Sequence, residues 1–360
     1  MKHTFLIGEI GQNHNGSVDI AKLIVENAAR DVREELFDIP LKGLDAVKLT
    51  KRDLRYELSD SEMRKPYTGR NSFGKTYGEH RAFLELSDEE HFEVYRYAKA
   101  LGLQFVETLC APSTLSLLRL FTPDYLKVAS RDLTNLPLLE AMAETGIPMI
   151  ISTGMAGDAE LETAVDIISA RHDNLHILHC VSEYPTHPKN VNLATITYLR
   201  KKYPRYSIGY SDHTVGISVP VAAVALGAEM IEKHITLDRR MRGTDQAGSL
   251  GPDGLNRMVR DIRLLEMEMG EERMFIADGV KGAKAKLERS VASSRNIAEG
   301  EVITEKDIHL LSPGTGIAWK DRHTVLGKKA ARDIPANEII QSQDLYDQTQ
   351  NTAIGSRSAK

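Results

Sequence analysis

The amino-acid sequence predicts an α/β protein, a (β/α)8 barrel followed by a small C-terminal β module. Eight short apolar segments typical of strands occur within residues 1–270, with amphipathic or Ala/Leu-rich segments typical of helices between them. Eight strands that alternate with helices over this length match such a barrel in count and size. The strands are expected at residues 5–10, 45–49, 104–109, 125–129, 148–152, 176–180, 207–210 and 230–235.

A doubly wound parallel sheet is the competing fold. The count of eight strands argues against it, and no G-x-G-x-x-G motif follows the first strand. Helices are expected at residues 19–29, 89–101, 137–144, 159–170 and 192–202.

The composition is that of an ordinary globular protein. Of the 360 residues 41% are hydrophobic and 27% are charged, and the formal net charge is -5. This charge gives no reason to expect nucleic acid as a partner, and an anionic substrate would need a local positive pocket. Cys110 and Cys180 each follow an apolar run and are expected to be buried thiols. No signal peptide or run of 18 apolar residues occurs, so a cytoplasmic location without membrane contact is expected.

Domain boundaries follow from changes in composition and from an internal repeat. After the barrel at residues 1–270, a polar linker is expected at 271–287 and a disordered tail at 349–360. Between them, Arg295–Ile308 resembles Arg332–Leu345, which predicts a small β module at residues 288–348. The longest connection in the barrel, residues 50–87, is expected to form a lid or an oligomer contact.

Two histidines end neighbouring strands. His213 follows the strand at residues 207–210, and His234 lies near the end of the strand at 230–235. Ligands bind at the carboxyl ends of the strands in parallel α/β folds, and two imidazoles there can hold one divalent metal. Asp245 and a glycine-containing loop follow just beyond. A single histidine at a strand end would more simply bond to the backbone, but two at matching strand ends favour a metal site.

Lysines and hydroxyl groups also gather at the predicted strand ends. Lys48 and Lys127 lie near the ends of the second and fourth strands. Lysines are rarely buried without a partner, so two of them with several hydroxyls indicate a pocket for a phosphate and a carboxylate. The alternative is that one lysine forms a structural ion pair with Glu9 or Asp132. The hydroxyl residues are Thr108, Ser130, Ser152, Ser182 and Ser211.

A metal beside an oxyanion pocket is compatible with three reactions. One is an aldol-type condensation of an enol phosphate with an aldehyde that the metal polarises. Another is a Schiff-base aldolase or lyase that uses Lys127 or Lys233. The third is metal-assisted hydrolysis. Outside enzymes, a binding protein with a decayed barrel stays open, although the histidine pair and the lysines argue against it.

Several motifs resemble those of the sialic acid synthase family, the phosphoenolpyruvate-dependent nonulosonate synthases. The closest matches are IGYSDH at residues 208–213 and EKHITL at residues 232–237. The terminal repeat, with SPGTG at residues 312–316, resembles that family's antifreeze-like (SAF) domain. Further matching motifs are GEIGQNHNG at 8–16, AVK at 46–48, KVAS at 127–130, ISTGM at 151–155 and HCVSEYP at 179–185.

This resemblance implies a (β/α)8 barrel with a β-clip-like SAF module, and a domain-swapped homodimer. It implies condensation of phosphoenolpyruvate with an open-chain N-acetylmannosamine-type sugar to a nonulosonic acid, catalysed with Glu9, Lys48, Lys127, His213 and His234. The histidines would bind Mn, with Mg or Co as alternatives. Phosphoenolpyruvate would contact Lys48, Thr108, Lys127, Ser130, Ser152, Ser182 and Ser211, and the sugar would contact Asn71, Tyr184, Asp245 and Ser312.

Three positions depart from the family pattern. Ser312 stands where many members have an Arg that reaches the sugar's N-acetyl group, and Thr50 and Asp132 replace a frequent Gln and Glu. Unless Arg70, Lys75 or Arg295 substitutes, the acceptor is expected to differ from plain N-acetylmannosamine. The alternatives are a 2,4-diacetamido-6-deoxyhexose (the legionaminic or pseudaminic acid routes), an unacetylated mannose, or a 6-phosphate.

Overall fold

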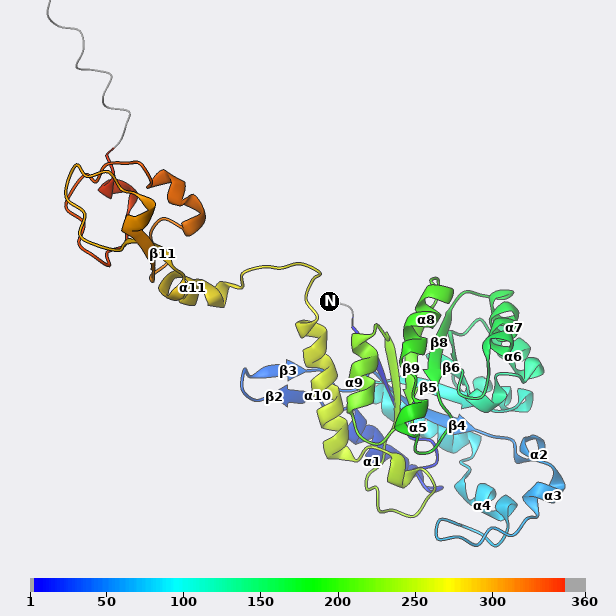
Figure 1. The fold of residues 1–360 in the computed structure, drawn as a ribbon. Coiled ribbons are helices and arrows are strands. Elements are labelled where there is room, and N and C mark those ends of the chain that lie inside the picture. The colour runs from blue at the N-terminus through cyan, green and yellow to red at the C-terminus, as the bar shows by residue number, and fades with distance from the viewer. Residues whose placement is uncertain (1–2, 347–360) are drawn as a thin grey trace, which may run out of the picture. The chain divides into compact units, whose positions relative to one another are not determined.

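The computed structural model describes residues 3–346, which divide into two compact units, residues 3–270 and 271–346 (Figure 1). The first unit is a closed barrel of eight parallel strands in the order β1-β10-β9-β8-β7-β6-β5-β4, so the predicted (β/α)8 barrel is confirmed. The strands are β1 (Phe5–Glu9), β4 (Ala46–Lys51), β5 (Gln104–Leu109), β6 (Tyr125–Val128), β7 (Met149–Ser152), β8 (Leu175–Cys180), β9 (Ser207–Asp212) and β10 (Met230–His234).

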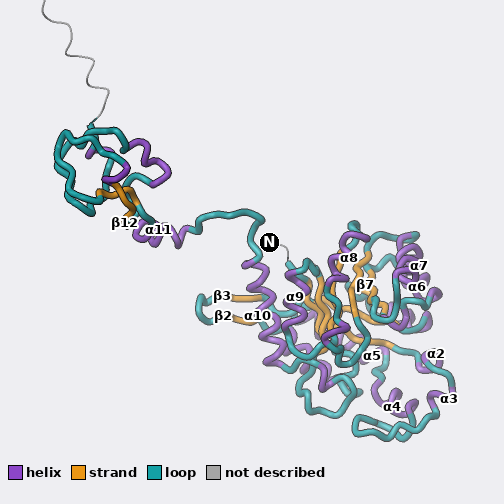
Figure 2. The backbone as a smooth tube through the Cα atoms, in the orientation of Figure 1, coloured by secondary structure: helices purple, strands orange, loops and turns teal. Residues whose placement is uncertain are grey.

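Helices pack around the strands (Figure 2). They begin where the sequence supplies caps, as at Ser87 and Glu90, which form a reciprocal capping box before α5. After β5 the chain forms a 3-10 helix, η1 (Pro112–Arg119), in place of an α-helix. The others are α1 (Val18–Ala28), α5 (Asp88–Ala100), α6 (Leu136–Ala143), α7 (Asp158–Ser169), α8 (Ala194–Lys202), α9 (Ser218–Ala225) and α10 (Pro252–Glu268). None of the helices in residues 3–346 is long and apolar enough to cross a membrane.

Alternation along the strands builds the barrel interior in layers. One layer is apolar and consists of the buried side chains Ile7, Ala46, Val106, Ile150, Leu178 and Met230. Successive side chains point to opposite faces of a strand, so the residue two positions later again points inward. Those later residues are Glu9, Lys48, Thr108, Ser152, Cys180 and Glu232. The barrel therefore has an apolar floor with a polar layer above it, toward the carboxyl ends of the strands.

Lys233 does not take part in this inner layer. It lies one residue beyond Glu232, and its ammonium group forms a buried ion pair with Asp212, its register partner on β9. The Asp212 carboxylate also accepts hydrogen bonds from the Tyr210 hydroxyl (3.0 Å) and the Thr214 backbone N–H (2.9 Å). Of the two lysines predicted for a Schiff base, Lys233 is thus held in a structural pair.

The connection between β4 and α5 contains three short helices, α2 (Leu54–Glu57), α3 (Asp60–Met63) and α4 (Tyr77–Leu84). Phe73 in this connection stacks on Phe83, with ring centroids 4.7 Å apart, and lies under the Arg242 guanidinium at 4.6 Å. The connection is therefore packed against the loop that follows β10. A two-stranded hairpin, β2 (Val32–Glu34) and β3 (Ile39–Leu41), precedes β4.

The C-terminal unit is built from the predicted repeat. Ile297 and Ile334, which are equivalent positions in the two copies, exchange two 2.8 Å backbone hydrogen bonds. Each copy is also braced by one ion pair of 2.7 Å, Arg295 with Asp307 and Arg332 with Asp344. The regular strands are β11 (Ser290–Ser293) and β12 (Ile308–Leu311). The segment expected to be a linker contains an exposed helix, α11 (Lys281–Leu287), and the expected disordered tail lies outside the described residues.

We predict that Asp212→Ala lowers the free energy of unfolding by about 3–5 kcal/mol, because it leaves the Lys233 ammonium buried without a partner. Urea denaturation followed by circular dichroism measures this. Asp238→Ala is the matched control, since it removes an exposed carboxylate paired with Arg240 and should change stability little.

The double variant Asp212→Leu/Lys233→Met should recover much of the loss, because both charges are then gone. A single variant as stable as the wild type would contradict a buried ion pair at this position.

Candidate active site

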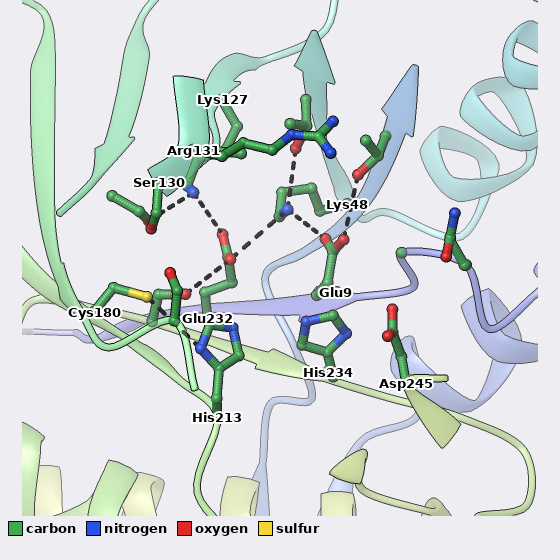
Figure 3. A pocket seen from close by; sticks show the side chains of 18 of the residues that line it. Glu9, Lys48, Lys127, Ser130, Arg131, Cys180, His213, Glu232, His234 and Asp245 are labelled. Atoms are coloured by element: carbon green, nitrogen blue, oxygen red, sulfur yellow. Dashed lines mark hydrogen bonds and ion pairs between the residues drawn. The ribbon is translucent and has the colours of Figure 1, made fainter. Parts of the chain in front are cut away.

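A pocket of about 270 Å³ opens at the carboxyl ends of the barrel strands (Figure 3). Most of the residues expected at the site line it. They are Glu9, Lys48, Thr108, Lys127, Ser130, Ser152, Ser182, Tyr184, Ser211, His213, His234 and Asp245. Asn71 is not in the lining and lies half-buried in the connection after β4. Ser312 belongs to the C-terminal unit, where its hydroxyl donates to the Leu287 carbonyl at 2.9 Å.

Four charged side chains lie at the base of the pocket, in the polar layer above the apolar one. The Lys48 ammonium lies 2.6 Å from a Glu9 carboxylate oxygen and 3.7 Å from Glu232, and the Lys127 ammonium also lies 3.7 Å from Glu232. Each of these side chains is almost fully buried. The ion pair of a lysine with Glu9, which was the alternative to an anion pocket, is therefore formed by Lys48. This pair lies in the pocket itself.

The pKa values of the two lysines shift in opposite directions, although Glu232 acts to raise both. Burial lowers the pKa of Lys48, but attraction to Glu232 and Glu9 outweighs burial and raises it overall. Burial lowers the pKa of Lys127, and attraction to Glu232 does not offset the combined effect of burial and repulsion from Lys48. Lys127 is therefore the lysine whose positive charge would gain more from an added anion.

Glu232 was not among the residues predicted from the sequence. Lys233 and His234 were the residues predicted for chemistry at the end of this strand, although adjacent residues on a strand point to opposite faces. A strict period of two from His234 would have identified Glu232 as an inward side chain. Ser211, its register partner on β9, donates a 3.0 Å hydrogen bond to its carboxylate.

The serine hydroxyls converge around Gly154. The Gly154 backbone N–H donates to the Ser130 hydroxyl at 3.0 Å, and the Lys127 ammonium donates to the Ser152 hydroxyl at 2.7 Å. A methyl group placed on Gly154 would meet the Ser182 hydroxyl and would lie 2.8 Å from the Ser130 hydroxyl. The absence of a side chain at Gly154 thus lets these hydroxyls and the lysine face one space, as an oxyanion requires.

The two histidines lie on neighbouring strand ends with ring centroids 5.5 Å apart. His213 Nδ1 lies 2.9 Å from the Val181 carbonyl, so we assign the proton to Nδ1, which leaves Nε2 as a free lone pair. His234 Nδ1 is buried and has no hydrogen-bond partner. Two imidazoles with available nitrogen atoms fit a divalent metal.

Other ligands for such a metal are not gathered around the histidines. Within residues 3–346, no group of three or more His, Cys, Asp or Glu side chains is arranged to hold a metal ion. Water or substrate oxygens would therefore complete the coordination, as in catalytic sites that keep open positions. Tyr184 covers the pair, with its ring centroid 4.0 Å from that of His213, and burial raises its pKa.

The pocket lining also contains three arginines that were not predicted from the sequence. They are Arg52, Arg81 and Arg131. Arg52 directly follows β4 and Arg131 comes three residues after the end of β6, and these positions in the sequence could have identified them. Arg81 is on α4, inside the long connection, where no strand period applies. Thr50, at one departure from the family pattern, lines the pocket and donates to Glu9 at 3.4 Å. Asp132 does not line it and pairs with Arg131.

The barrel matches the family model described as NeuB family over residues 40–274, and residues 288–345 match the SAF domain. The chain belongs to the NeuB family. It is 35% identical to human N-acetylneuraminate-9-phosphate synthase, over 94% of this chain and 92% of that protein. It is 32% identical to N,N'-diacetyllegionaminic acid synthase of Legionella pneumophila, over 93% of each chain.

Solved structures of NeuB-related proteins show the same fold. The crystal structure of the N-acetylneuraminic acid synthetase of Leptospira borgpetersenii, in complex with citrate, has a TM-score of 0.65 and 30% sequence identity. The alignment covers 78% of this chain and 90% of that one. Synthases of the NeuB family are generally metal-dependent, which agrees with the two available imidazoles.

We predict that Gly154→Ala raises the KM for phosphoenolpyruvate about ten- to a hundredfold, because the added methyl group displaces the Ser130 and Ser182 hydroxyls and removes one hydrogen bond to a charged group. Steady-state kinetics with varied phosphoenolpyruvate measure this change.

Gly248→Ala is the matched control, since nothing lies within 4 Å of its added methyl group. An unchanged KM in Gly154→Ala would show that the hydroxyls around Gly154 do not hold the anion.

Proposed function

We propose that this protein condenses phosphoenolpyruvate with an open-chain hexose or N-acetylhexosamine aldehyde to give a nonulosonic acid and phosphate. The observation that carries the proposal is a single pocket with two halves. Lys48, Lys127 and the serine hydroxyls form an anion site, and His213 and His234 form a metal site in the same lining. The relatives named as N-acetylneuraminate-9-phosphate and N,N'-diacetyllegionaminic acid synthases support it.

In the proposed reaction, C3 of phosphoenolpyruvate bonds to the aldehyde carbon, and water adds to C2. The C2–O bond then breaks and phosphate leaves with that oxygen. The phosphate and carboxylate of phosphoenolpyruvate are held by two lysines and five hydroxyl groups. These residues are Lys48, Lys127, Thr108, Ser130, Ser152, Ser182 and Ser211. These groups stabilise the anions throughout, because preformed donors in a buried site need little reorganisation.

Glu9 is the proposed base for the water. Its carboxylate lines the pocket and lies 2.6 Å from the Lys48 ammonium, where a carboxylate oxygen can accept the proton of the water. Gly11 keeps the space in front of it open, since a methyl group there would lie 3.0 Å from a Glu9 oxygen and 3.4 Å from the His234 ring. Tyr184 and Asp245, which line the same side of the pocket, are proposed to contact the sugar.

His213 and His234 are proposed to hold a divalent metal, Mn in the first instance, with Mg or Co as alternatives. Such an ion, when bound, acts as a Lewis acid on the aldehyde oxygen. The Val181 carbonyl orients the His213 ring and keeps its Nε2 free of a proton.

A Schiff-base lyase is the second candidate, because burial lowers the pKa of Lys127 and a neutral amine is the nucleophile in that chemistry. The Lys127 ammonium, however, is engaged by the Ser152 hydroxyl at 2.7 Å and lies 3.7 Å from Glu232, in the same lining as the serine hydroxyls of the anion site. We therefore assign Lys127 to anion binding.

We predict that EDTA abolishes phosphate release from phosphoenolpyruvate and a hexose, and that His213→Ala and His234→Ala lose the bound metal by elemental analysis. Each imidazole supplies one of only two protein ligands, so removing either should leave too few. His187→Ala is the control, since this exposed histidine does not line the pocket.

Full activity in metal-free protein would overturn the metal assignment. Borohydride treatment with pyruvate or phosphoenolpyruvate should leave the protein mass unchanged, and an adduct on Lys127 would instead establish the lyase.

We propose that the protein acts as a domain-swapped homodimer in which Ser312 of a second copy approaches the sugar. An Arg at this position could donate a charge-assisted hydrogen bond to an acetamide, and Ser is too short to do so. Asn71, in the connection after β4, is the other proposed sugar contact outside the pocket lining.

We predict that the kcat/KM ratio of N-acetylmannosamine over mannose rises about ten- to a hundredfold in Ser312→Arg, because one hydrogen bond to a charged group is gained. Kinetics with both sugars on wild type and variant measure this ratio. A strong wild-type preference for N-acetylmannosamine that the substitution leaves unchanged would remove Ser312 as the cause of specificity.

A further inference from the structure

The pocket contains a second group of cations, apart from the two lysines. Arg52 follows β4, Arg81 lies on α4, and Arg131 lies on the 3-10 helix η2 (Ser130–Asp132) after β6. Strands β4, β5 and β6 are neighbours in the barrel; β5 and β6 lie opposite β9 and β10, at whose ends the histidines stand, and β4 is separated from β10 by β1. Figure 3 shows Arg131 on the Lys127 side of the pocket, away from His213. We call these three residues the arginine cluster.

One carboxylate serves the whole cluster. The same oxygen of Glu57 pairs with Arg81, lies 2.6 Å from Arg131 and lies 3.5 Å from Arg52. Its second oxygen is buried and has no hydrogen-bond partner, and the Nε atoms of Arg52 and Arg81 also have none. Two further carboxylates each contact one arginine of the cluster, Glu85 at 3.3 Å from Arg52 and Asp132 at 3.3 Å from Arg131. The donors in the cluster therefore outnumber its well-placed acceptors.

A phosphomonoester matches this arrangement better than a carboxylate does. Arg81 lines the pocket and is only 6% exposed, and its Nε donor is buried without a hydrogen-bond partner. Guanidinium forks bind phosphate in a bidentate manner, and a phosphate carries more oxygens and more charge than a carboxylate.

Glu57 can give way to such a ligand. It is the last residue of α2, a helix of four residues with no buried member. Moving this helix would expose little apolar surface. The incoming phosphate would take the place of the Glu57 carboxylate in its ion pairs with the arginines.

We propose that the arginine cluster binds a phosphate group at the end of the acceptor sugar remote from the aldehyde, so that the preferred acceptor is a hexose 6-phosphate. This rests on the proposed condensation, in which the lysines hold phosphoenolpyruvate and the aldehyde faces the histidines. Figure 3 places Arg131 on the Lys127 side of the pocket, so an acceptor whose aldehyde faces the histidines would extend its far end toward the cluster. Glu57 occupies the phosphate position when no acceptor is bound.

The test compares mannose 6-phosphate with mannose in wild type, Arg131→Lys and Arg81→Gln. We expect wild-type kcat/KM to be at least a hundredfold higher for the phosphate ester. Each variant should lower that value about ten- to a hundredfold, because it loses hydrogen bonds to a dianion, and should change the value for mannose less than about twofold. Arg131→Lys keeps the positive charge and removes only the two parallel N–H donors of the guanidinium group. Arg64→Ala, at an exposed arginine of the same connection, is the control.

Two further readouts separate the outcomes. If the cluster serves phosphoenolpyruvate instead, the variants will raise the KM for phosphoenolpyruvate and lower turnover of both sugars equally, and the proposal is overturned. Calorimetric titration of mannose 6-phosphate and mannose needs no turnover, so it tests the cluster even if the condensation itself is absent. Glu57→Gln should tighten mannose 6-phosphate binding, and equal affinity for both sugars in wild type would refute the subsite.

Discussion

The ion pairs of Glu232 with Lys48 and Lys127 are the constraint on which the site depends. A buried ammonium group is costly unless a carboxylate or another anion accompanies it. Glu232 lies between the two lysines at 3.7 Å from each, close enough to support both and too far to saturate either. Ser211 orients its carboxylate from the neighbouring strand. The barrel can therefore hold the Lys48 and Lys127 ammonium groups above its apolar core. Both ammonium groups still have N–H donors that are free to bind an incoming anion.

The strand period positions these groups without any special loop. Glu9 is the register partner of Lys48, and Thr108 is the register partner of Lys127. Each lysine therefore has a polar side chain next to it on the neighbouring strand, at the same level of the barrel. The same period places Lys233 on the opposite face of β10, where Asp212 neutralises it. Adjacent residues of β10 therefore have different roles. The Glu232 side chain lies in the pocket, and the Lys233 side chain only stabilises the fold.

The barrel, and the lining residues on strand ends, could be predicted from the sequence because both depend on local apolar periodicity and position along a strand. Glu232 was missed where the period was not applied strictly. Arg81 could not be found in this way, because its direction depends on how the connection after β4 folds back, with Phe73 under Arg242. Asn71, from the same connection, was expected at the sugar and lies outside the lining for the same reason. Side-chain directions in such a connection are set by long-range packing and not by sequence spacing.

The reciprocal pairing of the two copies in the C-terminal unit makes that unit indivisible. Ile297 and Ile334 each satisfy the other's backbone, and both are fully buried in one shared apolar cluster. A single copy would have neither a core nor a partner for its central residue, so neither half could be lost or gained alone. Evolution can therefore transfer this module between proteins only as a whole cassette of two copies, and a change to one copy's buried face must be accommodated by the other.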